Sequence, residues 1–264
     1  MTANDILFRC SSLGYLMTNP RTGTDISETT KTHLVDVYVS HKYNRFTEIN
    51  GKYLDKGNDV EEASITVVSR RTKKFFKKNE QHLKNLFIMG TPDLFEGESI
   101  EKAEEIRDTK SSWDVYTFNR AKNKPLDPKY KWQGIGYMAL TGAKVCYIDY
   151  CLNNTPYYLI EKELRFESYN QPDGNTPNWI ELQIIANHVY DRETFQKYID
   201  FRGIAITDEY CQTVYDGFVE IPLEERHFSF EIKRDLVEID ALYKQIRRCR
   251  TWMNENLFNV EENG

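Results

Sequence analysis

The sequence lacks the features of a membrane protein, a secreted protein or a disordered chain. No apolar run approaches the roughly 18 residues that suggest a membrane helix. The first residues, MTANDILFRCSS, have neither the basic start nor the long apolar core of a secretory signal. Hydrophobic residues make up 40% and charged residues 29%, which is typical of a folded globular protein. We therefore expect a cytoplasmic protein that does not bind a membrane.

Cysteine and histidine are few and scattered. The five cysteines include no CxxC pair, so the sequence indicates neither a zinc ribbon nor a disulfide framework, and we expect reduced thiols. The five histidines lack the spacing of metal ligands, which argues against a zinc site. No Ser-His-Asp or Cys-His pattern and no P-loop is present. Neither ester hydrolysis nor ATP use is therefore implied.

The charge balance is slightly acidic. The chain has 35 basic and 41 acidic residues, a net charge of −6, which argues only weakly against a nucleic-acid partner. A nuclease needs carboxylates for its metals and can confine its basic residues to one groove, so the distribution outweighs the sum. Two stretches are locally basic, residues 70–78 and residues 122–131. The first fits a DNA cradle or a solvated helix end equally well, and the second could reach phosphate from a loop.

The length of 264 residues suits a single domain, residues 1–264, with an insertion or subdomain at 153–225. Periodicity and turn signals predict an α+β fold with a central mixed β-sheet flanked by helices. We expect helices at 26–43, 56–78, 130–141 and 236–257, and strands at 83–89, 94–95, 106–109, 144–152 and 227–232, the first three antiparallel. Within the insertion we expect a strand at 157–166, a polar loop at 168–178, a helix at 179–201 and then more loop.

Three charged residues interrupt the predicted central strands, namely Asp93, Asp108 and Lys110. Residues two apart in a strand share a face, so Asp108 and Lys110 point to one side and Thr109 to the other, with Asp93 across a hairpin. Carboxylates with water and phosphate oxygens hold Mg²⁺ or Mn²⁺, one or two ions per site, and the Thr109 carbonyl is a further candidate ligand. Lys110 could orient or deprotonate the attacking water. A DxK pair alone, however, is most often a solvated surface feature.

These motifs resemble those of the PD-(D/E)XK nuclease superfamily. GTPD followed by IRDTK is similar to its signature, with Asp108 in the Asp-or-Glu position and Lys110 in the Lys position. GNDVE resembles the GxxxE element of the lambda-exonuclease and RecB-like branches, which implies that Glu61 joins the metal site. WQGIGYM resembles their QxxxY helix and places Gln133 and Tyr137 one turn apart. The resemblance implies that Gln133 belongs to the catalytic group and that Gln133 and Tyr137 contact the DNA backbone near the scissile phosphate. Glu61 could instead be an ordinary exposed residue, and the helix face with Gln133 and Tyr137 could simply pack on the sheet.

The start of the chain resembles the phage-type, YqaJ-like side of this branch. FRCSSLGYLMTNPRTG is similar to the segment in which a Ser and a nearby Arg face the 5′-phosphate of a DNA end, which implies DNA binding by Ser11, its neighbour Ser12 and Arg9. The resemblance covers residues 6–152 and 226–258 and implies a restriction-endonuclease-like core. The stretch 153–225 has no counterpart in the family pattern.

The resemblance implies a metal-dependent exonuclease that degrades one strand of linear duplex DNA from a 5′ end. It further implies a single-strand annealing protein as partner in recombination, a homo-oligomer such as a ring of three, and the host cytoplasm as the location of a phage-encoded enzyme. Two alternatives remain open. One is an endonuclease or a RecB-like nuclease on the same core, and the other is a non-catalytic DNA-binding protein.

Overall fold

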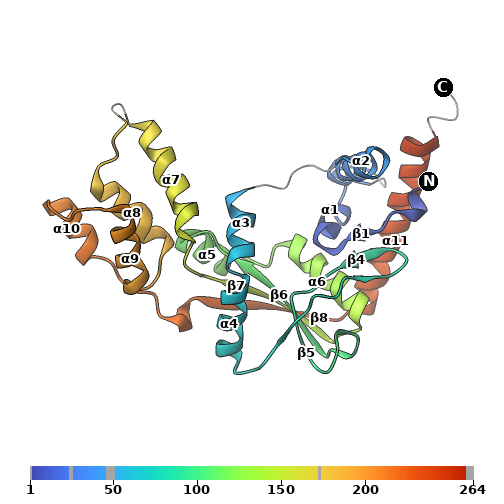
Figure 1. Ribbon diagram of the computed structural model, residues 1–264. Coiled ribbons are helices and arrows are strands. Elements are labelled where there is room, and N and C mark those ends of the chain that lie inside the picture. Colours follow the sequence, from blue (N-terminus) through green and yellow to red (C-terminus); the bar gives the residue numbers. More distant parts are fainter. Residues whose placement is uncertain (1, 24–25, 46–50, 172–173, 260–264) are drawn as a thin grey trace.

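The centre of the molecule is a five-stranded mixed sheet with helices on both faces (Figure 1). The computed structural model describes residues 2–23, 26–45, 51–171 and 174–259. The strand order is β2-β5-β6-β7-β8, and every neighbouring pair is antiparallel except β6 and β7, which are parallel. This confirms the predicted α+β class. The strands are β2 (Lys77–Lys78), β5 (Leu94–Glu96), β6 (Glu105–Ser111), β7 (Val145–Cys151) and β8 (His227–Lys233).

Helix α6 (Pro128–Thr141) covers one face of this sheet. Parallel strands need a crossover connection, and α5 (Val115–Lys122) with α6 supplies it between β6 and β7. The Asp127 side chain caps the start of α6 by accepting from the Lys129 N–H at 2.8 Å. A Cβ at Gly134 would lie 2.6 Å from an Ile232 methyl group, so glycine lets α6 approach the sheet closely. The position of α6 relative to β6 is therefore tightly determined.

Helices α3 (Lys52–Asp59) and α4 (Glu61–Thr72) lie on the opposite side of β6. The apolar side chains of α4 bury themselves against the sheet in a small separate cluster, made of Val67, Val68, Phe76, Leu94 and Cys151. Because side chains alternate along a strand, Asp108 and Lys110 face α6, whereas Glu105 and Arg107 face the α4 side. The two faces of β6 therefore carry different sets of charged residues.

Both ends of the described chain pack together beside the sheet (Figure 1). A three-stranded sheet of order β1-β4-β3 joins them, with β1 parallel to β4. The long helix α11 runs along this region and buries Ile239, Leu242 and Ile246 in the main core. The elements are η1 (Ala3–Asp5), β1 (Phe8–Arg9), η2 (Cys10–Ser12), α1 (Leu13–Leu16), α2 (Glu28–Tyr43), β3 (Leu83–Lys84), β4 (Ile88–Gly90), η3 (Ile100–Lys102), α11 (Leu236–Met253) and η5 (Asn254–Phe258).

Residues 153–225 form a helical arm that extends away from both termini (Figure 1). The arm has its own hydrophobic core, which includes Ile160, Leu182, Phe195 and Cys211. Its elements are α7 (Tyr157–Asn170), α8 (Asn178–His188), α9 (Arg192–Arg202), α10 (Glu209–Asp216) and η4 (Leu223–Glu225). Among the described residues, no helix combines the length and apolar character that crossing a membrane requires.

The single helix predicted at 56–78 is wrong, because this stretch contains the end of α3, helix α4 and strand β2. The chain breaks at Val60, which has φ −105° and ψ 12° and separates α3 from α4. Gly57, Asn58 and Asp59 are all poor helix formers, which explains an end here. A second end follows at Lys73, which adopts φ 55°, and the chain then enters strand β2. The basic stretch 70–78 therefore spans a helix end, a turn and an edge strand.

The strands predicted between 83 and 109 do not form one antiparallel series. β3 and β4 belong to the small sheet, where β4 also pairs in parallel with β1. β5 and β6 are antiparallel neighbours in the large sheet, as expected. Strand pairing between segments distant in the sequence leaves no local signal, which is why the split was not predictable from turn residues.

The interpretation of the arm needs three corrections. Residues 157–166 are helical, not a strand, because the apolar side chains that they bury, Leu159, Ile160 and Leu164, recur at helical spacing despite the aromatic composition. The single helix expected at 179–201 is two helices, and the Asp191 side chain caps the second. The expected loop after 201 contains α10. The predicted polar loop at 168–178 includes residues 172–173, which lie outside the described residues.

Candidate active site

Strand β6 places Asp108 and Lys110 side by side on the face that α6 covers. The Lys110 ammonium forms an ion pair with Oδ2 of Asp108 and lies 4.7 Å from the centre of the Tyr130 ring. Asp108 is almost completely buried, and Lys110 keeps partial exposure. The strand geometry predicted from the DxK spacing is therefore present, with an aromatic ring as an additional neighbour of the lysine.

Asp93 lies just before β5, next to the middle of β6. Its backbone N–H donates to the Arg107 carbonyl at 3.1 Å, and strand pairing begins at Leu94. Pro92 has no N–H with which to continue the strand backwards. Oδ2 of Asp93 accepts hydrogen bonds from the Thr109 backbone N–H at 2.6 Å and from its hydroxyl at 2.9 Å. Just before β5 begins, the side-chain carboxylate of Asp93 therefore bonds the backbone of β6.

Helix α6 adds Gln133 and Tyr137 to this group. The Gln133 side-chain amide donates to Oδ1 of Asp108 and to the Tyr137 hydroxyl, each at 2.9 Å. Gln133 and Tyr137 are both buried, 4% and 5% exposed. Gln133 of the predicted QxxxY pair thus contacts the carboxylate directly, and Tyr137 is linked to it through Gln133, which is more than packing of a helix face requires. Gln133 fixes the orientation of one Asp108 oxygen.

The electrostatics of the site reflect two carboxylates held close together away from water. Burial, followed by the negative charge of Asp108, raises the pKa of Asp93 to about 7. Burial on its own would lower the pKa of Lys110, but the Asp108 ion pair and the charge of Asp93 outweigh it, and the net pKa is raised. Burial and the nearby Asp108 also raise the pKa of Tyr137 well above its ordinary value. The lysine is therefore held as an ammonium and Tyr137 as a neutral phenol.

These residues fit a hard divalent cation. Oδ2 of Asp108 is buried, and its partner among the described residues is the Lys110 ammonium, a cation that a metal ion could replace or join. The raised pKa of Asp93 marks an excess of negative charge that a cation would relieve. Mg²⁺ is commonly held by one or two carboxylates together with waters and phosphate oxygens. In the described chain no three His, Cys, Asp or Glu side chains come together as a preformed metal site.

Glu61 is not part of this close group. It opens α4, and its carboxylate lies 3.5 Å from the Lys78 ammonium, which also binds Glu62 at 2.9 Å. The helix itself is tied to the sheet near the site, because the Ser64 hydroxyl lies 3.1 Å from that of Ser111. Glu61 is thus one turn from an anchored residue of α4 and is engaged by a lysine.

Arg9, Ser11 and Ser12 lie on the segment that packs against α6. The Ser12 hydroxyl donates to the Arg9 carbonyl at 2.9 Å, and Arg9 and Ser11 are exposed. Ser12 stands at the N-cap of α1 without capping it through its side chain. Between them, Cys10 is buried, and a Cβ at Gly136 would lie 2.9 Å from its sulfur. The expected phosphate-binding segment therefore touches the same helix as Gln133 and Tyr137.

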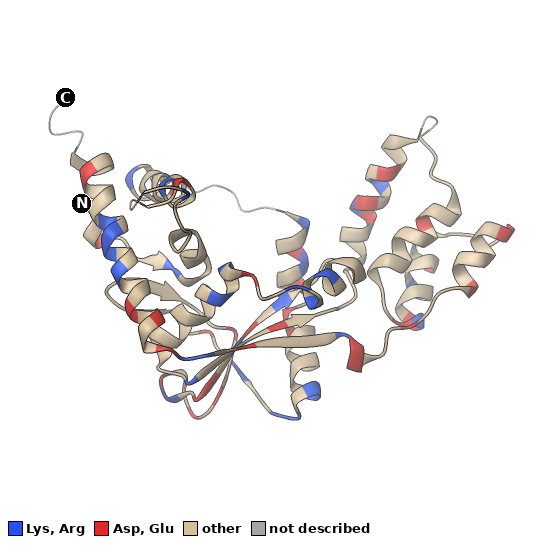
Figure 2. Cartoon of the chain, turned by 180° about the vertical axis from the view of Figure 1, so that it is seen from behind, with Lys and Arg blue, Asp and Glu red and all other residues tan. Residues whose placement is uncertain are grey.

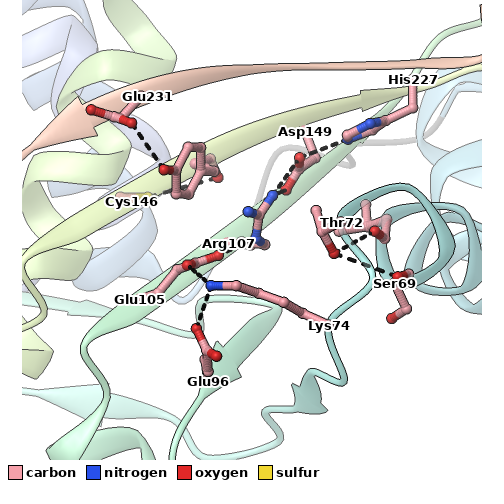
Figure 3. A network of polar contacts seen from close by, with 12 residues as sticks. Ser69, Thr72, Lys74, Glu96, Glu105, Arg107, Cys146, Asp149, His227 and Glu231 are labelled. Atoms are coloured by element: carbon pink, nitrogen blue, oxygen red, sulfur yellow. Dashed lines mark hydrogen bonds and ion pairs between the residues drawn. The ribbon is translucent and has the colours of Figure 1, made fainter.

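The opposite face of β6 carries a buried ionic network that sequence analysis missed (Figure 3). Arg107 donates to Glu105 at 2.6 Å and to both oxygens of Asp149 at 2.9 and 3.0 Å. His227 lies 2.8 Å from Asp149, and Lys74 binds Glu105 at 2.8 Å. Alternating charges at 105 and 107 in a strand next to the DxK motif were the available signal. Tyr130 was also missed, although it precedes Gln133 by three residues on the same helix.

Charged residues are distributed over most elements of the chain (Figure 2). Lys and Arg are not gathered on one helix or strand, and Asp and Glu lie among them. Near the site, Lys129 is 5.2 Å from the Tyr15 ring centre, and Lys131 pairs with Glu238 at 2.5 Å. The basic stretch 122–131 thus runs from the end of α5, through the connection between the two helices, into the start of α6.

Comparison with known proteins identifies the fold. No protein-family model and no curated protein matches the chain. Among solved structures, the chain is similar to a phage-related exonuclease from Haemophilus somnus 129PT, with a TM-score of 0.67 and 21% identity over 97% of each chain. It is also similar to an alkaline exonuclease (LHK-Exo) from Laribacter hongkongensis, with a TM-score of 0.59 and 12% identity over 99% of this chain and 94% of that chain.

The same alkaline exonuclease in complex with dAMP matches with a TM-score of 0.57 and 12% identity, over 97% of this chain and 92% of that chain. The chain therefore shares the mixed α+β fold of these exonucleases.

Proposed function

We propose that this chain is a divalent-metal-dependent exonuclease that hydrolyses phosphodiester bonds of linear double-stranded DNA from 5′ ends. The observation that carries the proposal is the pair of carboxylates formed by the partly buried Asp93 and the buried Asp108, with the Lys110 ammonium in contact with Asp108. The exonuclease neighbours support it, since their fold is the same. One of them is described in complex with dAMP, a deoxynucleotide, which supports DNA as the substrate class.

Asp93 and Asp108 would hold Mg²⁺ or Mn²⁺, and Glu61 is the proposed further ligand. The bound cation would stabilise charge on the phosphate and lower the pKa of a bound water. Gln133 holds Oδ1 of Asp108 through its amide, so the candidate ligand oxygens are Oδ2 of Asp108, which contacts the Lys110 ammonium, and the Asp93 oxygen that does not bond Thr109. The Thr109 carbonyl remains a candidate additional ligand. These assignments follow the hard-oxygen chemistry of the residues.

Lys110 acts as an ammonium in the resting site. Its raised pKa, due to the Asp108 and Asp93 charges, means that it donates rather than accepts a proton until those charges are neutralised. We therefore assign it to orienting the attacking water and stabilising negative charge on the phosphate. The aromatic ring of Tyr130 supports its position from one side. Tyr137, with Arg9, Ser11 and Ser12, is assigned to the DNA backbone and the 5′-phosphate.

A digestion experiment tests the activity and its polarity. Linear duplex labelled at one end and carrying a 5′-phosphate is incubated with Mg²⁺ beside closed circular DNA. We expect the linear substrate to be degraded from the 5′ end and the circle to survive. Cleavage of the circle would instead identify an endonuclease. A 3′ overhang among the products would supply the substrate of an annealing protein, and gel filtration with DNA would report the proposed homo-oligomer.

The variant Lys110→Ala tests the catalytic assignment. We expect cleavage to fall by about 10²- to 10⁴-fold, because a group that orients or protonates at the reacting centre contributes on that scale. Lys102→Ala is the matched control, since Lys102 is an exposed lysine paired only i,i+4 with Glu98 in the interactions described. Unchanged cleavage in Lys110→Ala, with Mg²⁺ present, would reject the catalytic role.

A further inference from the structure

A buried asparagine just after the edge strand β2 adjoins the turn that carries Asp93. Asn79 follows β2 directly and is 6% exposed. Its side-chain amide donates to the Pro92 carbonyl at 2.9 Å, and its backbone N–H donates to the Asp93 carbonyl at 2.8 Å. Two consecutive carbonyls, on either side of the Asp93 α-carbon, therefore bond the same residue.

Asn79 is itself held in one orientation. Its side-chain amide also donates to the Gln81 carbonyl at 3.1 Å, and its side-chain oxygen accepts from the Gln81 N–H at 3.1 Å. The donor and acceptor capacities of the amide group are thus used, and the group cannot rotate without losing a buried hydrogen bond. The Asn79 amide therefore holds the Pro92 carbonyl, and with it the Pro92–Asp93 peptide, in one orientation.

We propose that Asn79 is a positioning residue for the proposed metal site, because it fixes the Pro92–Asp93 backbone from which the Asp93 carboxylate reaches Thr109. This inference rests on the proposed function. Asp93 lies outside the paired part of β5, and backbone bonds hold it through its own N–H to the Arg107 carbonyl and through the Asn79 N–H to its carbonyl. The Asn79 side chain adds the bond that holds the preceding carbonyl, that of Pro92. Residues that orient metal ligands commonly affect metal affinity as strongly as some ligands do.

The neighbouring residue extends this role toward α4. Lys78 pairs with Leu94 in the sheet and contacts the carboxylate of Glu61 at 3.5 Å. The segment Lys78–Asn79 therefore contacts both the turn that carries Asp93 and helix α4, which carries Glu61. A displacement of this segment would move the Asp93 turn and release Glu61 together.

The chain contains a matched control in Asn85. Its side chain orders the next loop in the same manner, by accepting from the N–H groups of Phe87 at 2.8 Å and Ile88 at 3.0 Å and donating to the Tyr243 hydroxyl at 2.9 Å. It contacts neither Pro92 nor Asp93 in the interactions described. Asn79→Ala and Asn85→Ala therefore remove the same kind of loop-ordering amide, once beside the site and once away from it.

Two measurements on the full-length protein without DNA test the proposal. The first is Mn²⁺ binding by calorimetry, where we expect about tenfold weaker binding in Asn79→Ala and wild-type binding in Asn85→Ala. The second is hydrogen exchange of the Thr109 amide, which donates to Asp93. We expect faster exchange at Thr109 in Asn79→Ala only, measured in metal-free protein. If the alanine variant does not fold, Asn79→Leu keeps the volume without the hydrogen bonds and takes its place.

The outcomes separate this inference from the proposed function. If wild-type protein neither binds Mn²⁺ nor cleaves linear DNA, the proposed function fails. If wild-type protein does both, and a folded Asn79 variant matches it in Mn²⁺ affinity and in Thr109 exchange, the positioning role is overturned. Equal losses in the Asn79 and Asn85 variants would also overturn it, because they would show a general loss of loop order.

Discussion

The two faces of strand β6 carry charged residues in opposite conditions. On the α4 side, Arg107 is bonded to Glu105 and Asp149, and the buried charges are paired. On the α6 side, the Lys110 ammonium pairs with Asp108, and no described cation forms an ion pair with the neighbouring Asp93. The first face is electrostatically complete, whereas the second has an excess of negative charge.

This difference shows that burial of charge does not by itself indicate function. Arg107 and Asp108 are adjacent in sequence and similarly buried, at 4% and 2% exposed. What distinguishes them is whether their partners satisfy them. A satisfied buried network holds strands together, and an unsatisfied one is available to bind a ligand or a cation.

The largest expected effect on stability comes from removing Arg107 from the paired face of β6. In Arg107→Met we expect a loss of about 3–5 kcal/mol in the free energy of unfolding, because Asp149 and Glu105 are left as buried charges without their main partner. Urea denaturation measures this. In Arg107→Met combined with Asp149→Asn part of the loss should return, since the uncompensated carboxylate is gone.

The same variants test whether the two faces of β6 act independently. Arg107 points away from Asp108, so any Arg107→Met protein that folds should cleave DNA within a few-fold of wild type at a temperature below its transition. A folded variant with activity as low as that of Lys110→Ala would show that the two faces act as one unit.

A smaller effect of opposite sign is expected on the α6 face. The pKa of Asp93 is raised to about 7 in the folded protein, so ionising this carboxyl destabilises the fold. The destabilisation is absent below pH 4 and reaches its full size above pH 7. Asp93→Asn should therefore stabilise the metal-free protein by on the order of 2 kcal/mol at pH 8, a rise of several degrees in Tm, and by less at pH 5.

Thermal unfolding in EDTA at both pH values measures this difference. Asp149→Asn serves as the control, because it removes a buried carboxylate that is fully paired and should destabilise the protein at both pH values. An Asp93→Asn protein that is less stable than wild type at pH 8 would contradict the excess of negative charge on this face.

The smallest effect is expected at the edge of the paired network. Lys74 binds Glu96 at 2.7 Å and Glu105 at 2.8 Å, but its side chain is 41% exposed. Lys74→Ala should cost about 1 kcal/mol or less, because solvent screens such pairs. Urea denaturation at low and high salt checks this, and a loss as large as that of Arg107→Met would show that the network depends on its exposed member.

Local periodicity explains what the sequence predicted well. The shared face of Asp108 and Lys110 follows from the two-residue repeat of a strand, and the contact of Gln133 with Tyr137 follows from the helical turn. The α6 and β7 elements were predicted for the same reason, since each has a clear pattern over its whole length. Such features need no knowledge of distant partners.

The parts that were missed depend on contacts between distant segments. The Thr109 bonds to Asp93 require that β5 begin only at Leu94, and the Arg107 network requires that β7 lie next to β6 and β8 next to β7. The helix α7 was misread because its aromatic residues favour a strand locally, whereas its burial against the arm core decides the structure. Pairing and burial of this kind are properties of the whole chain.

The attachment of the helical arm has a consequence for the modularity of this chain. The arm leaves after β7 and returns before β8, and these strands are antiparallel neighbours. The Leu152 N–H donates to the Arg226 carbonyl at 2.9 Å, so the two ends of residues 153–225 are one hydrogen bond apart. In topological terms the arm is an enlarged hairpin loop. The pairing of β7 with β8 therefore closes the arm at its base, whatever the number of residues between the two strands.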